Sequence, residues 1–310
     1  MQSPWGEIEV CDAHVHFFSH GFFSVLAAQV SGRSGGPATA ESTAATLGWQ
    51  APPREPEALA AVWIRELDRR GVDRAALIAS VPGDEASAAA AVRSYPDRFY
   101  GYFMVDPTAA DALERVRAAL DGGHLHCICL FPAMHRYSIQ DERVRVVLEA
   151  AAAHPGVAIF VHSGVLTVGV RAKLGLASPF DMRFSNPIDL HSVALAFPKL
   201  RFIIPHFGAG YFREALMVCD LCPNVYLDTS SSNRWMLYQV GSLNLRQVFH
   251  QALNVVGPKR LLFGSDSSFF PRGWNQQIFE DQAKALYELD VSMGDARSIF
   301  SENLLRIISA

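Results

Sequence analysis

The sequence predicts an α/β protein built as a closed (β/α)8 barrel. Short apolar segments alternate with longer helix-like segments along the chain, and eight such apolar segments can be counted. They are apolar on successive residues, which is typical of parallel strands covered on both faces. Eight alternating units favour a closed barrel, with an open doubly wound sheet as the alternative.

The predicted elements follow one another at regular intervals. The strands are residues 8–16, 74–80, 99–104, 127–130, 157–162, 201–206, 225–228 and 261–264. The helices are residues 56–70, 84–95, 109–120, 141–154, 187–197, 211–222, 245–256 and 276–289, and an extra helix over 295–308 closes the chain. Helix boundaries rest on local signals, such as Pro56 at the start of the first helix and Gly71 at its end.

A long insertion separates the first strand from the first predicted helix. Residues 17–55 are rich in Gly, Ser, Ala, Thr and Pro, and we expect them to be weakly structured. A loop of this length inside a compact domain is usually functional or a lid. Its aromatic residues either pack over a ligand or fill the mouth of the barrel. We expect residues 1–310 to form a single barrel domain with 17–55 as the lid.

Composition excludes several classes of protein. The chain has 310 residues, 50% of them hydrophobic, and a net charge of -4, which is enough for one large core. We find no cluster of Lys and Arg typical of nucleic-acid binding. No apolar run has the length of a membrane span, and no signal peptide is visible, so a cytoplasmic protein is expected. The five cysteines fit reduced thiols better than a disulfide framework.

The run Asp12-Ala13-His14-Val15-His16 ends the first predicted strand. Side chains alternate between the faces of a strand, so Asp12, His14 and His16 point the same way. Residues two apart lie roughly 6.5–7 Å apart along a strand, close enough for two imidazoles to bind one cation. The alternative is a pair of partly buried, hydrogen-bonded histidines.

Other polar residues follow later strands at the same end. His162, His206, Asp228 and Asp266 come directly after, or at the last residue of, strands five to eight. Active sites of (β/α)8 barrels lie at the carboxyl ends of the strands. Four histidines, including His14 and His16, together with Asp266 at one rim therefore predict a divalent metal site.

These motifs resemble the amidohydrolase superfamily, in its amidohydrolase-2 branch. The matching segments are D-A-H-V-H at 12–16, V-H-S-G at 161–164, P-H-F-G-A-G at 205–210, G-S-D at 264–266 and the helix over 301–306. This branch includes metal-dependent hydrolases and aminocarboxymuconate-semialdehyde decarboxylase-like enzymes. The resemblance implies that the metal ligands are His14, His16, His162 and Asp266. It also implies His206 as an acid or base beside the metal, and it suggests a homodimer.

One departure from the superfamily pattern bears on the number of metals. Members with two metals usually bridge them with a carboxylated lysine at the end of strand four, where this chain has Cys129. We therefore predict one ion, with Zn²⁺ preferred and Mn²⁺, Fe²⁺ or Co²⁺ also suited to the ligands. Asp12 either orients a ligand or only secures its strand.

The expected activity is metal-dependent hydrolysis of a small ester, lactone or amide. In this hypothesis Asp266 takes the proton of an activated water and His206 polarises the substrate carbonyl. The alternative is non-oxidative decarboxylation of an aromatic or unsaturated acid with the same ligands, and a third is a barrel that binds without catalysis. A substrate carboxylate could pair with an arginine of the predicted loops, although surface ion pairs explain them equally well; these are Arg171, Arg234 and Arg272.

Overall fold

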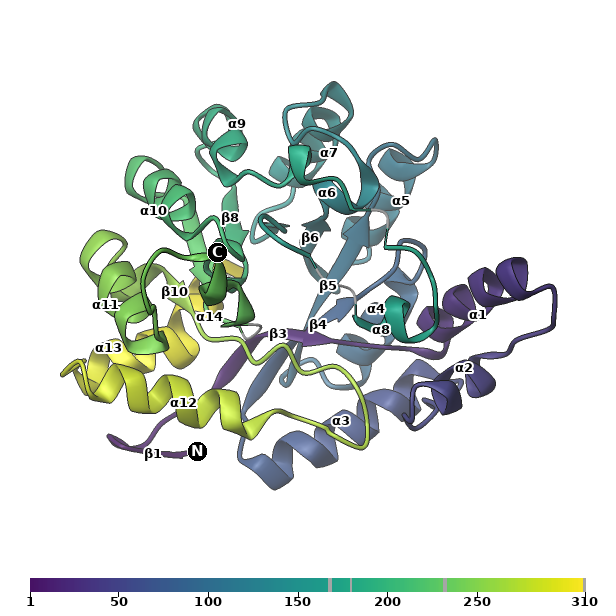
Figure 1. The fold of residues 1–310 in the computed structure, drawn as a ribbon, viewed down its shortest axis with the longest axis horizontal. Coiled ribbons are helices and arrows are strands. Elements are labelled where there is room, and N and C mark those ends of the chain that lie inside the picture. The colour runs from purple at the N-terminus through teal and green to yellow at the C-terminus, as the bar shows by residue number, and fades with distance from the viewer. Residues whose placement is uncertain (167–168, 179, 231–232, 309–310) are drawn as a thin grey trace.

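The computed structural model describes residues 1–166, 169–178, 180–230 and 233–308, apart from the side chain of Ser34. It confirms the predicted barrel of eight parallel strands, which neighbour one another in the order of the chain (Figure 1). The strands are β3 (Cys11–His16), β4 (Arg74–Ala79), β5 (Phe99–Val105), β6 (Leu125–Leu130), β7 (Ala158–Val161), β8 (Arg201–Ile204), β9 (Val225–Asp228) and β10 (Leu261–Leu262).

The barrel closes between β3 and the residues that follow β10. The backbone N–H of His16 donates to the carbonyl of Ser267 at 2.7 Å, and that of Asp266 donates to the carbonyl of His14 at 3.0 Å. These bonds place the motif at 264–266 directly beside the motif at 12–16. Two segments at opposite ends of the sequence therefore share one stretch of the rim.

The helices that follow the strands surround the barrel (Figure 1). They are α3 (Pro56–Arg70), α4 (Glu85–Ser94), α5 (Ala112–Asp121), α7 (Glu142–Ala152), α9 (Leu190–Ala196), α10 (Phe212–Leu221), α11 (Leu245–Val255) and α12 (Gln276–Tyr287). The predicted closing helix is α13 (Met293–Arg297) and α14 (Asn303–Ile308), joined by a π-helical turn over Ser298–Glu302. Two short helices, α6 (Pro132–His135) and α8 (Gly169–Lys173), lie in loops after β6 and β7.

The expectation that residues 17–55 are weakly structured is wrong. They contain α1 (His20–Ser34) and α2 (Ala40–Thr46), which lie beside each other at one side of the molecule (Figure 1). Ser19 caps α1 by accepting the N–H of Phe22, and Thr39 forms a capping box with Ser42. The two helices and two residues that follow β7 bury an apolar cluster of their own. Its members are Phe22, Phe23, Leu26, Ala40, Ala44, Leu47, Val170 and Leu176.

Two further features complete the fold. A small antiparallel hairpin of β1 (Gln2–Ser3) and β2 (Gly6–Glu7), which the sequence did not suggest, precedes the barrel. All five cysteines are buried free thiols, as expected. Within the described residues, no helix combines the length and the apolarity that crossing a bilayer requires.

Candidate active site

A cavity of about 700 Å³ opens at the carboxyl ends of the barrel strands. The five residues predicted to bind metal or catalyse all line it: His14, His16, His162, His206 and Asp266. Its walls are aromatic and aliphatic, with Phe18, Phe22, Trp49, Met104, Phe131, Met134, Val165, Leu166, Val170, Trp235, Tyr238 and Phe269. Polar groups that converge in an otherwise apolar cavity are typical of a small-molecule site.

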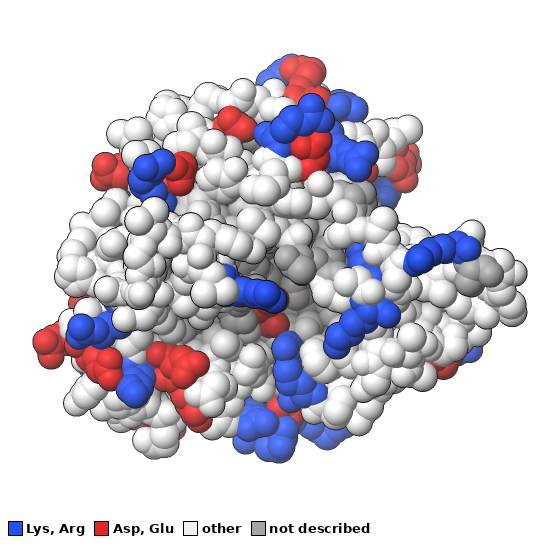
Figure 2. All heavy atoms as spheres, viewed as in Figure 1, with Lys and Arg blue, Asp and Glu red and all other residues white. Residues whose placement is uncertain are grey.

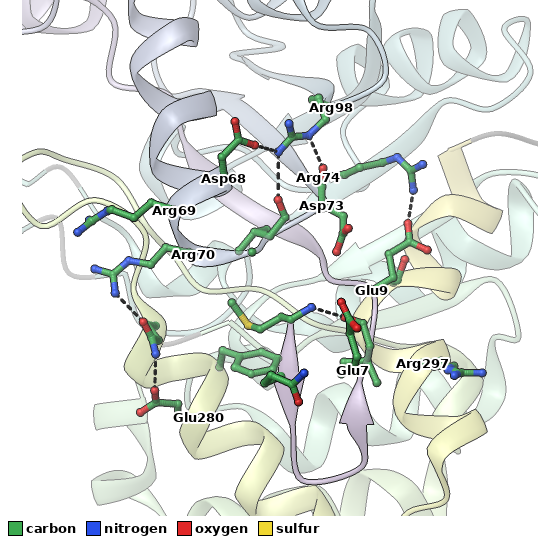
Figure 3. A pocket seen from close by; sticks show the side chains of 18 of the residues that line it. Glu7, Glu9, Asp68, Arg69, Arg70, Asp73, Arg74, Arg98, Glu280 and Arg297 are labelled. Carbon is green, nitrogen blue, oxygen red and sulfur yellow. Dashed lines mark hydrogen bonds and ion pairs between the residues drawn. The ribbon is translucent and has the colours of Figure 1, made fainter.

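A larger hollow of about 1540 Å³ lies at the opposite end of the barrel, beneath the amino ends of the strands (Figure 3). It is lined by charged side chains that already pair with one another. Arg98 lies 2.8 Å from Asp68, and Arg74 pairs with Glu9. We therefore place the candidate site in the smaller cavity, because only there do the predicted ligands meet.

Three side chains form a compact donor group. The Nε2 atoms of His14 and His16 lie 3.4 Å apart. Asp266 Oδ1 lies 3.2 Å from Nε2 of His16 and 3.7 Å from Nε2 of His14. All three donor atoms lie within 4.8 Å of one another, which is the spacing of ligands around a single ion.

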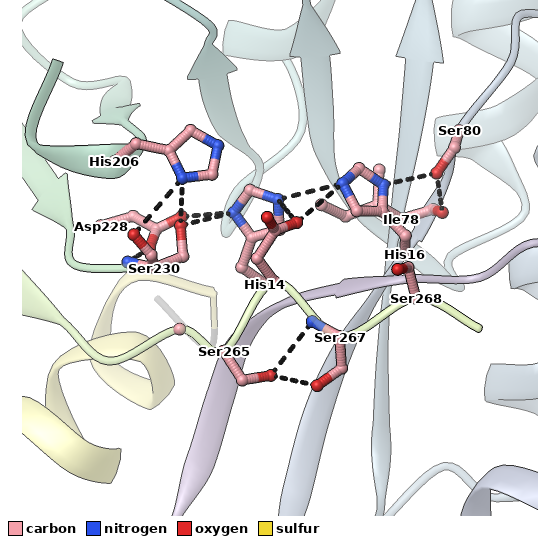
Figure 4. A network of polar contacts seen from close by, with 12 residues as sticks. His14, His16, Ile78, Ser80, His206, Asp228, Ser230, Ser265, Ser267 and Ser268 are labelled. Carbon is pink, nitrogen blue, oxygen red and sulfur yellow. Dashed lines mark hydrogen bonds and ion pairs between the residues drawn. The ribbon is translucent and has the colours of Figure 1, made fainter. Parts of the chain in front are cut away.

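The hydrogen-bond partners of the two Nδ1 atoms indicate which nitrogen of each imidazole carries the proton (Figure 4). His14 Nδ1 lies 2.6 Å from Asp228 Oδ2, and a carboxylate only accepts, so this nitrogen carries a proton. His16 Nδ1 lies 2.7 Å from Ser80 Oγ, whose own proton goes to the carbonyl of Ile78 at 2.9 Å. His16 Nδ1 must therefore donate as well. In the neutral rings, both Nε2 atoms are left with lone pairs that face each other.

This arrangement fits a metal ion. Two nitrogen lone pairs and a carboxylate oxygen that converge without a proton between them repel one another. A cation at their centre turns that repulsion into attraction. Two imidazoles and a carboxylate suit Zn²⁺ and other divalent transition metals, and the bonds from Nδ1 to Asp228 and Ser80 are the outer contacts that orient such ligands.

Charge and burial act in opposite directions on the three ligands. Burial raises the pKa of Asp266, but a hydrogen bond from the protonated form of His16 and the positive charge of the protonated form of His14 outweigh it and hold that pKa below its ordinary value. Burial lowers the pKa of His16. For His14, the charge and hydrogen bond of Asp228 together overcome burial and raise the pKa.

His162 lines the same cavity but stands apart from the group of three. Its ring lies 5.2 Å from that of Phe131 and 5.5 Å from that of His206, measured between centroids. Burial lowers its pKa well below the ordinary value, so the ring is neutral. Its Nδ1 is buried and has no partner among the described residues. The role of His162 as fourth ligand stays a prediction.

Two site residues adopt a backbone conformation that is unusual outside glycine. Asp266 has φ 55° and His206 also has φ 55°. Such residues cost free energy and persist where their surroundings hold them in place. The backbone of Asp266 is held by the bond of its N–H to His14 and by Arg272, which donates to its carbonyl at 3.1 Å.

Gly264 is required by close packing behind the site. A Cβ at this position would lie 2.6 Å from Asp228 Oδ1 and 2.9 Å from the Cβ atoms of His14 and Ser230. No side chain fits in that space. The glycine of the G-S-D motif therefore lets the last strand approach the first strand and the loop after β9.

Asp12 secures the barrel and does not touch a metal ligand's ring. Its Oδ1 accepts the backbone N–H groups of His14 and Ser265, and its Oδ2 accepts the indole N–H of Trp274 at 2.7 Å. Burial raises its pKa to about 6, against the lowering effect of these bonds. These contacts match the second of the two roles expected for Asp12, which is to secure its strand.

For three polar residues around the metal ligands, the sequence patterns did not predict a role. Asp228 was noted only for its place at a strand end, and Ser80 and Ser230 were missed. Ser80 directly follows β4, and Ser230 lies two residues beyond Asp228. Their positions at strand ends were a usable signal, although serine is too common there for the signal to be specific.

The three candidate arginines lie in different settings. Arg234 lines the cavity and is exposed, with no ion pair or hydrogen bond to the described residues. Arg272 lies over the ring of Phe269 at 4.6 Å. Arg171 donates to Gln29 Oε1 at 2.6 Å and does not line the cavity. Figure 2 shows the face of the molecule hollowed near its centre, with Lys and Arg side chains around the hollow.

The fold and this rim of histidines define a class of protein, and comparison with known families agrees. The model of the amidohydrolase family matches residues 11–307 of the chain. The chain therefore belongs to the amidohydrolase family, as its motifs indicated.

One curated relative and several solved structures are similar to this chain. Protein fluG of Emericella nidulans is 30% identical over 115 residues, which are 36% of this chain and 13% of that protein. The chain thus matches only a small part of its curated relative's length. Among solved structures, 5-carboxyvanillate decarboxylase LigW2 of Novosphingobium aromaticivorans, with bound manganese, has a TM-score of 0.64 at 16% identity, covering 98% of this chain and 97% of its own.

Two further structures share the fold. A probable 2-pyrone-4,6-dicarboxylic acid hydrolase of Acinetobacter baumannii has a TM-score of 0.60 at 14% identity, covering 98% of this chain and 100% of its own. An amidohydrolase of Burkholderia multivorans with bound zinc has a TM-score of 0.62 at 16% identity, covering 97% of this chain and 99% of its own. At these identities the likeness establishes the fold alone.

Proposed function

We propose that this protein is a metal-dependent hydrolase of a small ester, lactone or amide. The observation that carries the proposal is the convergence of three metal-ligating atoms, on His14, His16 and Asp266, inside a cavity. When bound, a divalent ion supplies Lewis-acid activation of a water molecule and of a substrate carbonyl. His162 is proposed as the fourth ligand.

One ion is proposed, and Zn²⁺ is preferred. Cys129 on β6 is fully buried and does not line the cavity, so it is not placed to replace a bridging lysine. The structural neighbours support both zinc and manganese as candidates, since one amidohydrolase holds zinc and LigW2 holds manganese. The mixed nitrogen and oxygen donor set is compatible with either.

Asp266 and His206 are the residues proposed to move protons. The Asp266 carboxylate is partly exposed to the cavity, and its lowered pKa keeps it ionised at neutral pH. It can accept the proton of a water molecule that attacks the substrate. The ring of His206 lies 5.0 Å from that of His14, close enough for His206 to act on a substrate oxygen near the metal ligands.

Decarboxylation of an aromatic acid is the second candidate function. The observation that favours it is the stacked aromatic side chains in the wall of the cavity. Trp49 stacks on Phe269 at 4.1 Å with an interplanar angle of 8°, and Phe18 stacks on Phe22 at 4.0 Å. These parallel rings offer a flat wall to a planar substrate. LigW2, which shares the fold, is a decarboxylase.

The two reactions are separated by their products. Purified protein, with its metal content measured, is incubated with a panel of esters, lactones and amides and a panel of aromatic acids. Acid release in the first panel supports hydrolysis, whereas CO₂ release without acid release supports decarboxylation. His206→Ala should retain the metal and lose turnover. No turnover by the unaltered protein in either panel would point to a barrel that binds without catalysis, and equal turnover by the variant and the unaltered protein would show that His206 is not catalytic.

A further inference from the structure

The hydroxyl of Ser230 lies between two imidazoles of the site (Figure 4). Its Oγ is 2.9 Å from Nδ1 of His206 and 3.1 Å from Nδ1 of His14. Ser230 is fully buried, so its single proton needs an acceptor inside the protein. Within the described part of the chain, those two nitrogens are the hydrogen-bond partners of this hydroxyl.

One of the two nitrogens is already occupied. His14 Nδ1 donates its proton to Asp228 Oδ2 at 2.6 Å. The other carboxylate oxygen, Oδ1, receives the backbone N–H of Ser230 at 2.6 Å. A nitrogen that carries a proton cannot accept another, so the Ser230 hydroxyl cannot donate to His14. The hydroxyl oxygen can accept a second, longer hydrogen bond from the N–H of His14, at 3.1 Å, while the hydroxyl proton is donated to another acceptor.

His206 Nδ1 is the remaining acceptor. The competing arrangement places a proton on this nitrogen and directs it to the backbone carbonyl of Ser230, at 3.4 Å. That distance is longer than the 2.9 Å to the hydroxyl, and the arrangement would leave the hydroxyl proton of Ser230 buried without a partner. An unsatisfied buried donor costs more than a weak bond returns.

We infer that Ser230 is a positioning residue that fixes the tautomer of His206. Its hydroxyl donates to Nδ1, so the proton of the neutral ring sits on Nε2. In this form His206 offers an N–H donor, which suits a group that stabilises a developing oxyanion or protonates a leaving group. The proton acceptor of the reaction is then Asp266. This catalytic meaning rests on the proposed function, but the tautomer itself does not.

The tautomer can be read without a substrate. The full chain is labelled with ¹⁵N-histidine, and long-range proton–nitrogen correlation spectra are recorded for the metal-free and the zinc-loaded protein at neutral pH. The His206 signals are assigned by their loss in His206→Gln. We expect Nε2 of His206 to be protonated and Nδ1 to be unprotonated. A proton on Nδ1 of His206 in the unaltered protein would overturn the inference, whether or not zinc binds.

Variants of the hydroxyl test its role directly. Ser230→Ala should move the proton of His206 to Nδ1, because only the backbone carbonyl of residue 230 then remains as a partner. Ser230→Thr keeps a hydroxyl and should keep the tautomer. Thr229→Val is the matched control, since it removes a neighbouring buried hydroxyl that bonds to Gln282 at 2.6 Å instead. An unchanged tautomer in folded Ser230→Ala would also overturn the inference, and if that variant does not fold, the spectrum of the unaltered protein decides.

Discussion

The Nε2 atoms of His14 and His16 lie 3.4 Å apart, and in the neutral rings each proton sits on the opposite nitrogen, Nδ1. Neither can donate to the other, and Asp266 adds a carboxylate oxygen to the same point. The group is therefore electrostatically unfavourable by itself. Its place on a rigid barrel rim prevents the side chains from relaxing apart, and this relationship makes metal removal the most direct test of the site.

Metal removal should lower thermal stability. A ligand held at about 100 times its dissociation constant contributes about 2.7 kcal/mol. For a domain of 310 residues, with an unfolding entropy of about 0.65 kcal/mol/K, that corresponds to a fall in Tm of about 4 °C on chelation. Differential scanning calorimetry before and after dialysis against a chelator, with elemental analysis of both samples, measures the effect.

Re-addition of one equivalent of Zn²⁺ should restore the Tm. His16→Ala should lose both the metal and the response to chelator. His250→Ala, on the exposed face of α11, is the control and should keep both. A protein that purifies without metal and shows no shift with added Zn²⁺, Mn²⁺, Fe²⁺ or Co²⁺ would rule out the site.

Asp228→Asn should weaken metal binding more than Ser80→Ala. The carboxylate of Asp228 accepts from His14 Nδ1 and from the backbone N–H of Ser230, and an amide can satisfy only one of those two donors. Losing such an orienting partner costs roughly 10–100-fold in metal affinity. The neutral hydroxyl of Ser80 makes a weaker bond to His16, so its loss should cost less.

Competition with a chromophoric chelator measures both affinities on one scale. Ser163→Ala serves as the control, because it removes a buried hydroxyl next to His162 that makes no hydrogen bond to the described residues. An Asp228→Asn variant that binds as tightly as the unaltered protein would contradict the proposed proton assignment at His14.

The barrel and the location of the rim could be predicted because both depend on local sequence patterns. Apolar strands, Pro and Gly at helix ends and polar residues after strands are visible without tertiary information. The helix α3 (Pro56–Arg70) was predicted with its boundaries, since Pro56 begins it and Gly71 ends it. The histidines of the site could be placed for the same reason, because each lies near the carboxyl end of a strand or directly after it.

The helices α1 and α2 and the outer partners of the histidines could not be predicted, because they depend on contacts between distant segments. The stability of α1 and α2 comes from burial against residues such as Val170 and Leu176, more than a hundred residues later. The bond between Ser80 and His16 joins different strands, and Ser230 meets His14 only because the barrel closes. A serine at a strand end carries no local sign of its partner.

Gly264→Ala should displace the residues that support the metal ligands. The added methyl group would lie 2.6 Å from Asp228 Oδ1 and 2.9 Å from the Cβ of Ser230, so the loop after β9 must move. Overpacking of this kind costs about 1–3 kcal/mol. We expect a lower Tm together with weaker metal binding, since the bond between Asp228 and His14 lengthens.

Gly32→Ala is the matched control. A Cβ there meets nothing within 4 Å, and an alanine in α1 should stabilise the protein by about 0.5–1 kcal/mol. Thermal melts and zinc titrations of both variants separate the effects. Undiminished zinc affinity in Gly264→Ala would show that the site tolerates movement of Asp228.

Arg234→Ala should impair the binding of carboxylate substrates. Arg234 is the candidate arginine that both lines the cavity and lacks an ion pair within the described structure. A charge-assisted bond to a carboxylate contributes about 1.5–3 kcal/mol, so KM should rise roughly 10–100-fold with little change in kcat. Arg171→Ala should leave KM unchanged, because that guanidinium is bound to Gln29 outside the cavity. The comparison is made with a carboxylate substrate and its neutral methyl ester, and a rise in KM that is equal for both would mean that Arg234 shapes the cavity without pairing with the substrate.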